Sequence, residues 1–212
     1  MEICDGVLIV NKPKGVTSHD VVSFFRKKLD VGKVGHAGTL DPLACGVLII
    51  LIGDATKRQK EFMDKEKEYV ATACLGATST TDDAEGEIRV KAVKKKPTFT
   101  EIKKVLKEFI GEIDQVPPSF SAVKINGQRA YKLARGGKFP KIKARKVNIY
   151  KIEMISYKWP TLKISVVCSS GTYIRALACD IGGKLGCGAY LMDLERIRSG
   201  NFRIENSLTI SS

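Results

Sequence analysis

Residues 33–52 have the sequence KVGHAGTLDPLACGVLIILI. We expect residues 32–43 to form a loop, because glycine lets a backbone turn sharply and approach a ligand closely. The apolar run over residues 46–52 predicts a buried strand and is too short to span a bilayer. Pro42 disfavours a helical backbone at Asp41. We therefore expect the Asp41 carboxylate at the mouth of a loop held by a strand, where it serves either chemistry or a turn cap.

Strand and helix patterns alternate on both sides of this loop. Ser18 is expected to cap a helix that buries Val21, Val22, Phe25 and Leu29 on one face. Strands are expected over 6–10, 46–52, 68–75, 147–157, 161–167 and, last, 189–197, and helices over 18–29, 55–64, 100–110, a short stretch before Gly136-Gly137, and 172–185. A polar turn is expected over 78–86 and a hairpin turn at 125–128, and the strands over 147–157 and 161–167 are expected to form a hairpin around Trp159-Pro160. The pattern predicts one mixed α/β domain over residues 1–212 with a basic insertion.

The positive charge is concentrated in one part of the chain. The net charge is +13, and the stretch from Gln115 to Ile152 contributes +10 because it contains no acidic residue. A lysine-rich proteome alone would not cluster the charge, so we expect a polyanionic partner, with nucleic acid first and an acidic membrane surface second. Tyr131, Phe139 and Tyr150 lie among these cations and either stack on bases or turn into the core.

The cysteines and histidines are not spaced as metal ligands. The chain has six cysteines and two histidines, with no C-x-x-C pair. This argues against a zinc cluster and against the zinc-dependent base deaminases. Acidic residues at the start of the chain are atypical of a signal peptide. We therefore expect reduced thiols, most of them buried, in a soluble cytoplasmic protein that binds no metal.

Two further side chains are candidates for chemistry. Tyr69 shares a strand face with Ala71 and Ala73, which leaves room over its ring, unless it is simply a core tyrosine. Arg175 falls in the first turn of a helix, where the helix dipole opposes a cation. It therefore needs an anionic partner, unless it lies on the surface over Tyr173. With Asp41, these residues suggest an RNA-binding enzyme.

Five blocks of the sequence resemble the TruB family of tRNA pseudouridine synthases. In chain order they are GVLIVNKPKGVTS (6–18), KVGHAGTLDPLACGVL (33–48), KEYVA (67–71), SGTYIRALACDIG (170–182) and LGCGAYLMDLERIRS (185–199). The blocks are long, occur in the order typical of the family and extend over nearly the whole chain. One departure is Cys45, which stands where a threonine is common in the family.

The resemblance implies an isomerase that converts uridine to pseudouridine at position 55 in the T-loop of tRNA. It implies a mixed, mainly antiparallel sheet flanked by helices, and no metal or organic cofactor. Asp41 matches the catalytic aspartate, as nucleophile or as electrostatic stabiliser, and Arg175 matches its partner. Tyr69 matches the tyrosine that stacks on the target base and serves as the base. The residues matched to substrate binding are His36, Tyr173, Leu194 and Lys12.

The resemblance also implies how the RNA is held. The insertion over about 124–146 is expected to clamp the T-arm by its shape and phosphates. Many bacterial members carry a C-terminal RNA-binding domain, which we do not expect here. We expect a monomer with no obligatory protein partner and no membrane contact. The cations expected to contact RNA are Lys124, Arg129, Lys132, Arg135, Lys141, Lys143, Arg145 and Lys146.

Three other functions compete with this interpretation. A non-catalytic RNA-binding or tRNA-folding protein would not need the set Asp41, Tyr69 and Arg175. A guide-RNA-dependent pseudouridine synthase relies on a C-terminal RNA-binding domain and on partner proteins. A membrane-surface protein would carry a long amphipathic basic helix, which the sequence does not predict.

Overall fold

The structure is a computed structural model that describes residues 5–125 and 127–210. Residues 5–70 and 194–210 form one compact unit, unit 1, and residues 71–193 form the other, unit 2. Strands β4 (Lys67–Leu75) and β12 (Ala189–Ser199) run through the two boundaries. Because both boundaries fall within strands, the single domain over residues 1–212 remains our proposal.

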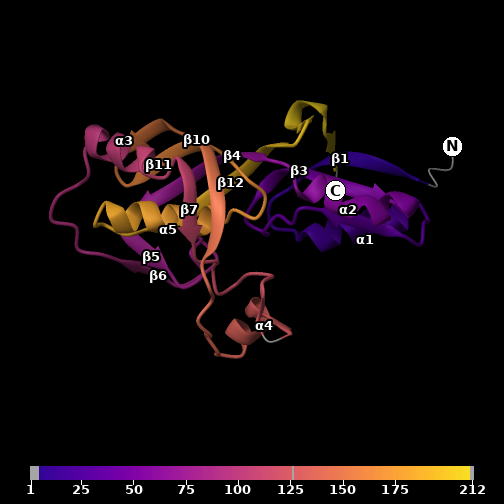
Figure 1. The fold of residues 1–212 in the computed structure, drawn as a ribbon, viewed down its shortest axis with the longest axis horizontal. Coiled ribbons are helices and arrows are strands. Elements are labelled where there is room, and N and C mark those ends of the chain that lie inside the picture. The colour runs from indigo at the N-terminus through magenta and orange to yellow at the C-terminus, as the bar shows by residue number, and fades with distance from the viewer. Residues whose placement is uncertain (1–4, 126, 211–212) are drawn as a thin grey trace. The chain divides into compact units, whose positions relative to one another are not determined.

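Unit 1 is a sheet with short helices (Figure 1). Its strands are β1 (Gly6–Lys12), β2 (Val34–Ala37), β3 (Cys45–Ile52), β13 (Phe202–Arg203) and β14 (Leu208–Thr209), and its helices are α1 (Ser18–Lys28), η1 (Gly53–Arg58), α2 (Gln59–Met63) and η2 (Ile204–Asn206). The strand order is β14-β1-β3-β12, with β2 paired to β3 and β13 to β12. The helix expected over 55–64 is thus a 3-10 helix followed by α2, and two short strands follow the one expected to be last.

Strand β3 is the core of unit 1. Its residues from Val47 to Ile52 are completely buried. Both faces are covered, so the strand is a continuous apolar run rather than an alternating one. Ile49 and Leu51 pack with Ala37 of β2 and with Phe62 of α2. The buried strand predicted from the sequence is therefore confirmed.

The start of α1 differs from the prediction. Thr17, not Ser18, is the N-cap, and it forms a capping box with Asp20. The Ser18 hydroxyl is buried, donates to the Leu40 carbonyl oxygen (3.0 Å) and accepts from the Leu40 amide (2.9 Å). The expected cap residue instead holds the loop that carries Asp41.

The loop expected over residues 32–43 contains a strand. β2 pairs antiparallel with β3, so that Val34 lies opposite Ile52 and Ala37 opposite Ile49. Two of its four residues are Gly35 and Ala37, so the segment has too few large apolar side chains to predict a strand from the sequence. Pairing with the already buried β3 decides the conformation.

Gly46 allows β3 and β12 to approach each other closely. Its φ is +102°, and an added Cβ would lie 2.2 Å from the Arg196 carbonyl oxygen. Arg196 lies opposite Gly46 in the parallel β3–β12 pair. No residue with a side chain fits at this position without a backbone shift.

Unit 2 is built on a long β-hairpin, which confirms the hairpin predicted around Trp159-Pro160. Its strands are β5 (Ala77–Ser79), β6 (Ile88–Val90), β7 (Gly111–Gln115), β8 (Lys124–Ile125), β9 (Gln128–Arg129), β10 (Arg145–Lys158) and β11 (Thr161–Cys168), and its helices are α3 (Phe99–Lys107), α4 (Ala130–Arg135) and α5 (Ile174–Lys184). The main sheet has the order β12-β4-β11-β10-β7, with β10 antiparallel to both neighbours. Helix α3 packs on β10 and α5.

The basic insertion leaves this sheet as the segment around α4 (Figure 1). It contains the short β8–β9 hairpin and α4, whose C-cap is Gly136. Both features agree with the sequence, although Asn126 of the predicted turn lies outside the described residues. The large, mainly antiparallel sheet with few helices confirms the predicted fold class. Within the described residues, no helix has the length and apolar character needed to cross a membrane.

Adjacent glycines in α5 give a matched test of this packing. An added Cβ at Gly182 would lie 2.3 Å from the Ala189 amide nitrogen, whereas at exposed Gly183 it would meet no atom within 4 Å. We expect Gly182→Ala to lower the free energy of unfolding by about 1–3 kcal/mol or more through overpacking. Gly183→Ala should raise it by about 0.5 kcal/mol, because alanine is the better helix former. Urea denaturation of both variants checks this, and equal effects would contradict the close approach of α5 to β12.

Candidate active site

Asp41 lies half-buried in the loop between β2 and β3. Its neighbours on both sides are held by hydrogen bonds. Ser18 binds both backbone groups of Leu40, and the Gly15 amide donates to the Pro42 carbonyl oxygen (2.9 Å). The backbone around the carboxylate is therefore fixed before any substrate arrives, as catalysis by a positioned group requires.

Arg196 of β12 forms hydrogen bonds with the backbone on both sides of this loop. Arg196 is 1% exposed. Its Nε donates to the Val47 carbonyl oxygen (2.7 Å), and its Nη2 donates to the Gly38 carbonyl oxygen (2.9 Å). Arg196 is not among the site residues predicted from the sequence. The signal that could have found it is a cation at an inward position of a strand that begins with a buried apolar run.

Lys12 acts on the same loop through a turn. Its side chain is fully buried, and Nζ donates to the carbonyl oxygens of Pro13 (2.8 Å) and Val16 (2.7 Å). This closes the turn that contains Gly15, whose amide binds Pro42. A role of Lys12 in substrate binding stays a prediction; the contacts described here position the turn.

His36 of β2 is half-buried and is neutral at neutral pH. Burial, and then the positive charge of Arg196, lower the pKa of His36 below its usual 6.5. Its carbonyl oxygen accepts a hydrogen bond from Nε2 of Gln59 (2.6 Å). His36 also lines a cavity of about 330 Å³ together with Gln59 and the side chains of Arg26 and Lys33.

Tyr69 and Leu194 are buried within unit 1. Tyr69 is 8% exposed on β4, where Lys67, Ala71 and Ala73 share its buried face, as the alternation predicts. Leu194 is 6% exposed on β12. Both side chains are thus placed by strands rather than by loops, which suits a pocket of fixed shape.

Arg175 is buried in the first turn of α5, within unit 2. Its side chain is 5% exposed, and Nη1 lies 3.2 Å from Oδ2 of Asp83. Nη1 also donates to the Thr81 carbonyl oxygen (3.0 Å), and Nη2 donates to the Phe120 carbonyl oxygen (3.0 Å). Arg175 therefore has an anionic partner, as its position in the first helical turn requires, but this partner is Asp83. The alternative of a surface arginine is wrong.

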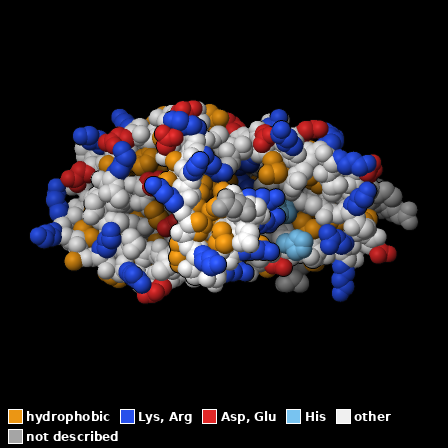
Figure 2. Space-filling view, turned by 60° about the horizontal axis from the view of Figure 1, so that its bottom comes forward, with side chains coloured by type: hydrophobic (Ala, Val, Ile, Leu, Met, Phe, Trp, Pro, Cys, Tyr) orange, Lys and Arg blue, Asp and Glu red, His pale blue; other side chains and the backbone are white. Residues whose placement is uncertain are grey.

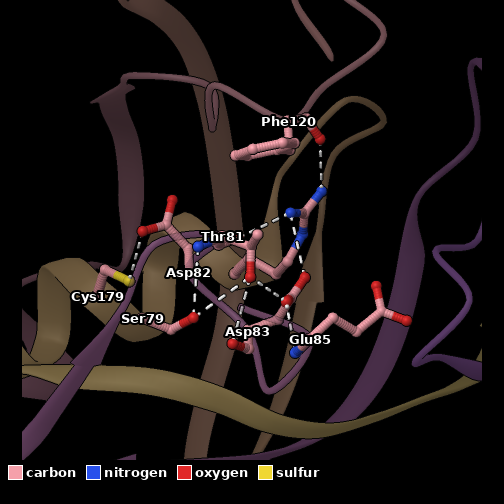
Figure 3. Close-up of polar contacts among 8 residues, drawn as sticks. Ser79, Thr81, Asp82, Asp83, Glu85, Phe120 and Cys179 are labelled. Atoms are coloured by element: carbon pink, nitrogen blue, oxygen red, sulfur yellow. Dashed lines mark hydrogen bonds and ion pairs between the residues drawn. The ribbon is translucent and has the colours of Figure 1, made fainter. Parts of the chain in front are cut away.

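Asp83 was not predicted as a site residue, because the sequence indicates only a polar turn over residues 78–86. It is 2% exposed, and its Oδ1 accepts from the Thr81 hydroxyl (2.5 Å) and from the Glu85 amide (3.1 Å). These bonds orient Oδ2 toward Arg175 (Figure 3). The available signal was the pair of acids at 82–83 within a turn rich in serine, threonine and glycine.

The neighbouring Asp82 has a different partner. The Cys179 thiol donates to its Oδ1 at 3.4 Å. Burial raises the pKa of both groups above their ordinary values, which keeps the thiol protonated. Of the five cysteines that the structure describes, none is in a disulfide, two are buried and three are half-buried. In the described ranges, no three His, Cys, Asp or Glu side chains are grouped so that they could hold a metal ion.

Tyr173 is held at the N-terminal end of α5. Its amide donates to Oε1 of buried Gln115 (2.8 Å), and its carbonyl oxygen accepts from Nε2 of the same residue (3.0 Å). The Arg145 guanidinium lies over the Tyr173 ring, 4.6 Å from its centroid, and donates to the Gly171 carbonyl oxygen. Arg145 is therefore a packing partner of Tyr173 as well as a candidate RNA contact.

The basic insertion presents cations and aromatic rings to solvent. Figure 2, with the lower side of Figure 1 turned forward, shows lysine and arginine side chains interspersed with apolar ones. Phe139 and Tyr150 are 64% and 51% exposed, so these two rings do not turn into the core. Lys146 differs from the other cations, because it pairs with Asp114 (3.1 Å) and Glu112 (3.4 Å). The exposed cations are Lys124, Arg129, Lys132, Arg135, Lys138, Lys141, Lys143 and Lys146.

The structure thus brings the predicted site residues together in two groups. Unit 1 holds Asp41, Tyr69, His36, Lys12 and Leu194. Unit 2 holds Arg175, Tyr173 and the basic insertion. The pairing of Asp41 with Arg175 stays a prediction.

Comparison with known proteins identifies the family. A family model for the N-terminal domain of TruB family pseudouridylate synthases matches residues 26–174. A tRNA pseudouridine synthase B from Francisella philomiragia is 47% identical over 209 residues, which is 98% of this chain and 69% of that protein. The enzyme of the same name from Protochlamydia amoebophila is 46% identical, over 96% of this chain and 78% of that protein.

Solved structures agree with this assignment. A chain in a crystal structure of a Cbf5-Nop10-Gar1 complex has a TM-score of 0.78 and 34% identity, and the match covers 99% of this chain. This chain spans about half the length of that one (54%). A crystal structure of a pseudouridylate synthase, 17% identical with a TM-score of 0.53, shares the fold. The chain therefore belongs to the TruB family of pseudouridylate synthases, which are isomerases.

Proposed function

We propose that this chain converts uridine to pseudouridine in the T-loop of tRNA, at position 55, and that it acts in the cytoplasm as a monomer. Relatives named tRNA pseudouridine synthase B, 46% and 47% identical over almost the whole chain, support tRNA as the substrate. The observation that carries the catalytic assignment is Arg175, a buried arginine that three protein groups fix at the start of α5.

Asp41 is the catalytic carboxylate in this proposal. The reaction breaks the C1′–N1 bond of the target uridine, turns the base, and joins C5 to C1′. The C5 proton leaves to a base, and N1 gains a proton. A carboxylate at C1′ serves either as nucleophile or as stabiliser of positive charge on the sugar. The hydrogen bonds on both sides of Asp41 give it the fixed position that either role needs.

Arg175 is proposed as the partner that keeps Asp41 ionised and oriented. A guanidinium carries five N–H donors in a rigid fork, so an arginine that holds Asp83 still has donors for a second carboxylate. The ion pair to Asp83 fixes the fork on one side. In a site with little water, a charge-assisted bond to a fixed arginine is stronger than one to a mobile lysine.

The target base is proposed to leave its stack and enter a pocket formed by Tyr69, Tyr173 and Leu194. Enzymes that act on a base inside folded RNA must extrude it, and aromatic and apolar side chains receive it. Tyr69 stacks on the base and accepts the C5 proton. Neutral His36 occupies the space that the base leaves, where a charged imidazole would be costly to bury.

The basic insertion is proposed to clamp the T-arm. Its exposed lysines and arginines, apart from the carboxylate-paired Lys146, contact phosphates, and Phe139 provides an exposed ring for stacking. Lys12 acts by positioning the turn beside the Asp41 loop.

Incubation with an unmodified tRNA transcript, without guide RNA or other protein, tests the proposal directly. We expect one pseudouridine, at position 55, when the product is mapped by chemical sequencing. A product only in the presence of a guide RNA and partner proteins would favour the guide-dependent alternative. Tight tRNA binding without any product would favour a non-catalytic RNA-binding protein.

Replacing the carboxylate separates chemistry from binding. We expect Asp41→Asn to abolish turnover while tRNA affinity stays within several-fold, because the amide keeps the shape of the side chain but cannot act as nucleophile or stabilise a cation. Single-turnover assays and filter binding measure the two quantities. Turnover near the wild-type rate would remove Asp41 from the mechanism.

The arginine and its ion-pair partner give a second test. Arg175→Lys keeps the positive charge but loses the rigid guanidinium with its several N–H donors. Asp83→Asn removes the ion pair that orients the Arg175 guanidinium. We expect each to slow the single-turnover rate at least about tenfold at saturating enzyme, since a displacement of about 1 Å costs up to about a hundredfold. Asp82→Asn is the matched control, because Asp82 binds Cys179, and asparagine tolerates its positive φ of 65°.

The control should stay within about threefold of the wild-type rate. If Asp83→Asn is as fast as Asp82→Asn, orientation by the buried ion pair is not part of catalysis. Thermal melts of all three variants identify any loss of rate that comes from unfolding.

Salt dependence tests the clamp. We expect Lys141→Ala with Lys143→Ala to lower the slope of log affinity against log salt by about 1.4–1.8, because each phosphate contact contributes about 0.7–0.9. Lys146→Ala with Lys151→Ala is the matched control, since both ammonium groups already have carboxylate partners at 2.8–3.4 Å. Equal slopes for the two double variants would place the clamp elsewhere.

A further inference from the structure

A second basic segment accounts for the rest of the positive charge. Residues 91–107 contain seven lysines and a single acid, Glu101, and so carry +6. Together with the +10 of residues 115–152 this exceeds the net charge of +13, so all other residues together carry −3. A general excess of lysine would spread over the chain, whereas this charge is confined to two segments.

The lysines of this segment are exposed and largely without carboxylate partners. All seven are exposed. Of these seven lysines, only Lys95 forms an ion pair with another described residue, with Glu101 at 2.9 Å. Lys104 and Lys107 lie in the last turn of α3, where the helix dipole favours a cation. No such local reason applies to Lys91, Lys94, Lys96 and Lys103.

Residues 95–101 of this segment are held by hydrogen bonds, an ion pair and an aromatic contact. Thr98 and Glu101 form a capping box at the start of α3, and Lys95 joins the preceding loop to the same Glu101. These hydrogen bonds and the charge of Lys95 lower the pKa of Glu101 to about 2. The Tyr157 hydroxyl donates to the Pro97 carbonyl oxygen (2.7 Å), and the ring packs edge-on against Phe99 at 5.2 Å. We call residues 91–107 the α3 platform.

We propose that the α3 platform is a second RNA-binding surface, which contacts the phosphate backbone of the tRNA outside the T-arm. Like charges held close together repel, and a polyanion relieves this repulsion. Within unit 2, the platform and the insertion around α4 lie well apart (Figure 1). One RNA that reaches both must therefore extend beyond a single stem-loop. The inference rests on the proposed function, because it takes tRNA as the ligand.

The test compares a whole tRNA transcript with its isolated T-arm stem-loop. The variant combines Lys94→Ala, Lys96→Ala and Lys103→Ala. We expect it to bind the transcript at least about tenfold more weakly and to lower its salt slope by about 2–3, since each lost phosphate contact removes about 0.7–0.9. Affinity for the T-arm stem-loop should change less than twofold. The control combines Lys27→Ala, Lys60→Ala and Lys65→Ala, which removes the same charge from exposed positions of unit 1.

Three results would contradict the proposal that the α3 platform is a second RNA-binding surface. The transcript affinity of the platform variant could be unchanged, the control could lose as much affinity, or the T-arm stem-loop could lose as much as the transcript. The last two would indicate a general electrostatic field rather than a separate surface. Failure of the proposed function is detected independently, because the wild-type protein would then make no pseudouridine in either RNA while its binding is still measured.

Discussion

The ion pair between Arg175 and Asp83 is the interaction on which the organisation of unit 2 depends. A cation in the first turn of a helix is opposed by the helix dipole, and a buried cation also loses its hydration. Arg175 is stable there because a buried carboxylate and two backbone carbonyl oxygens surround it. Removing one partner of such a pair costs about 3–5 kcal/mol, since the other charge stays buried. The pair therefore constrains the turn that contains Thr81 and the segment at Phe120 that leads into the basic insertion.

Unit 1 uses a similar device. Arg196 is a buried arginine whose hydrogen bonds go to the carbonyl oxygens of Gly38 and Val47, one on each side of the Asp41 loop. Its charge also helps to keep His36 neutral. In each unit, then, a strand or helix supplies a buried guanidinium that binds the backbone carbonyl oxygens of two separate segments. Functional loops are mobile when few bonds hold them, and these arginines supply such bonds.

The sequence predicted the elements whose pattern is local. The apolar run of β3, the alternation of β4 around Tyr69 and the β10–β11 hairpin were all confirmed. It did not predict the role of Ser18, the strand β2, or the roles of Asp83 and Arg196. Each of these depends on partners far away in the chain, and Arg175 and Thr81 are 94 residues apart. The partner that Arg175 needs was predicted from the helix dipole, but its identity within unit 2 required the fold.

The most direct test of this account is a double-mutant cycle on Arg175 and Asp83, measured as single-turnover rates at saturating enzyme. If Asp83 acts only by orienting Arg175, the variant that combines Arg175→Lys with Asp83→Asn should be no slower than the slower single variant. A double variant slowed by the product of the two single effects would show that the residues act independently. That result would contradict the central claim that the ion pair makes Arg175 fit for catalysis.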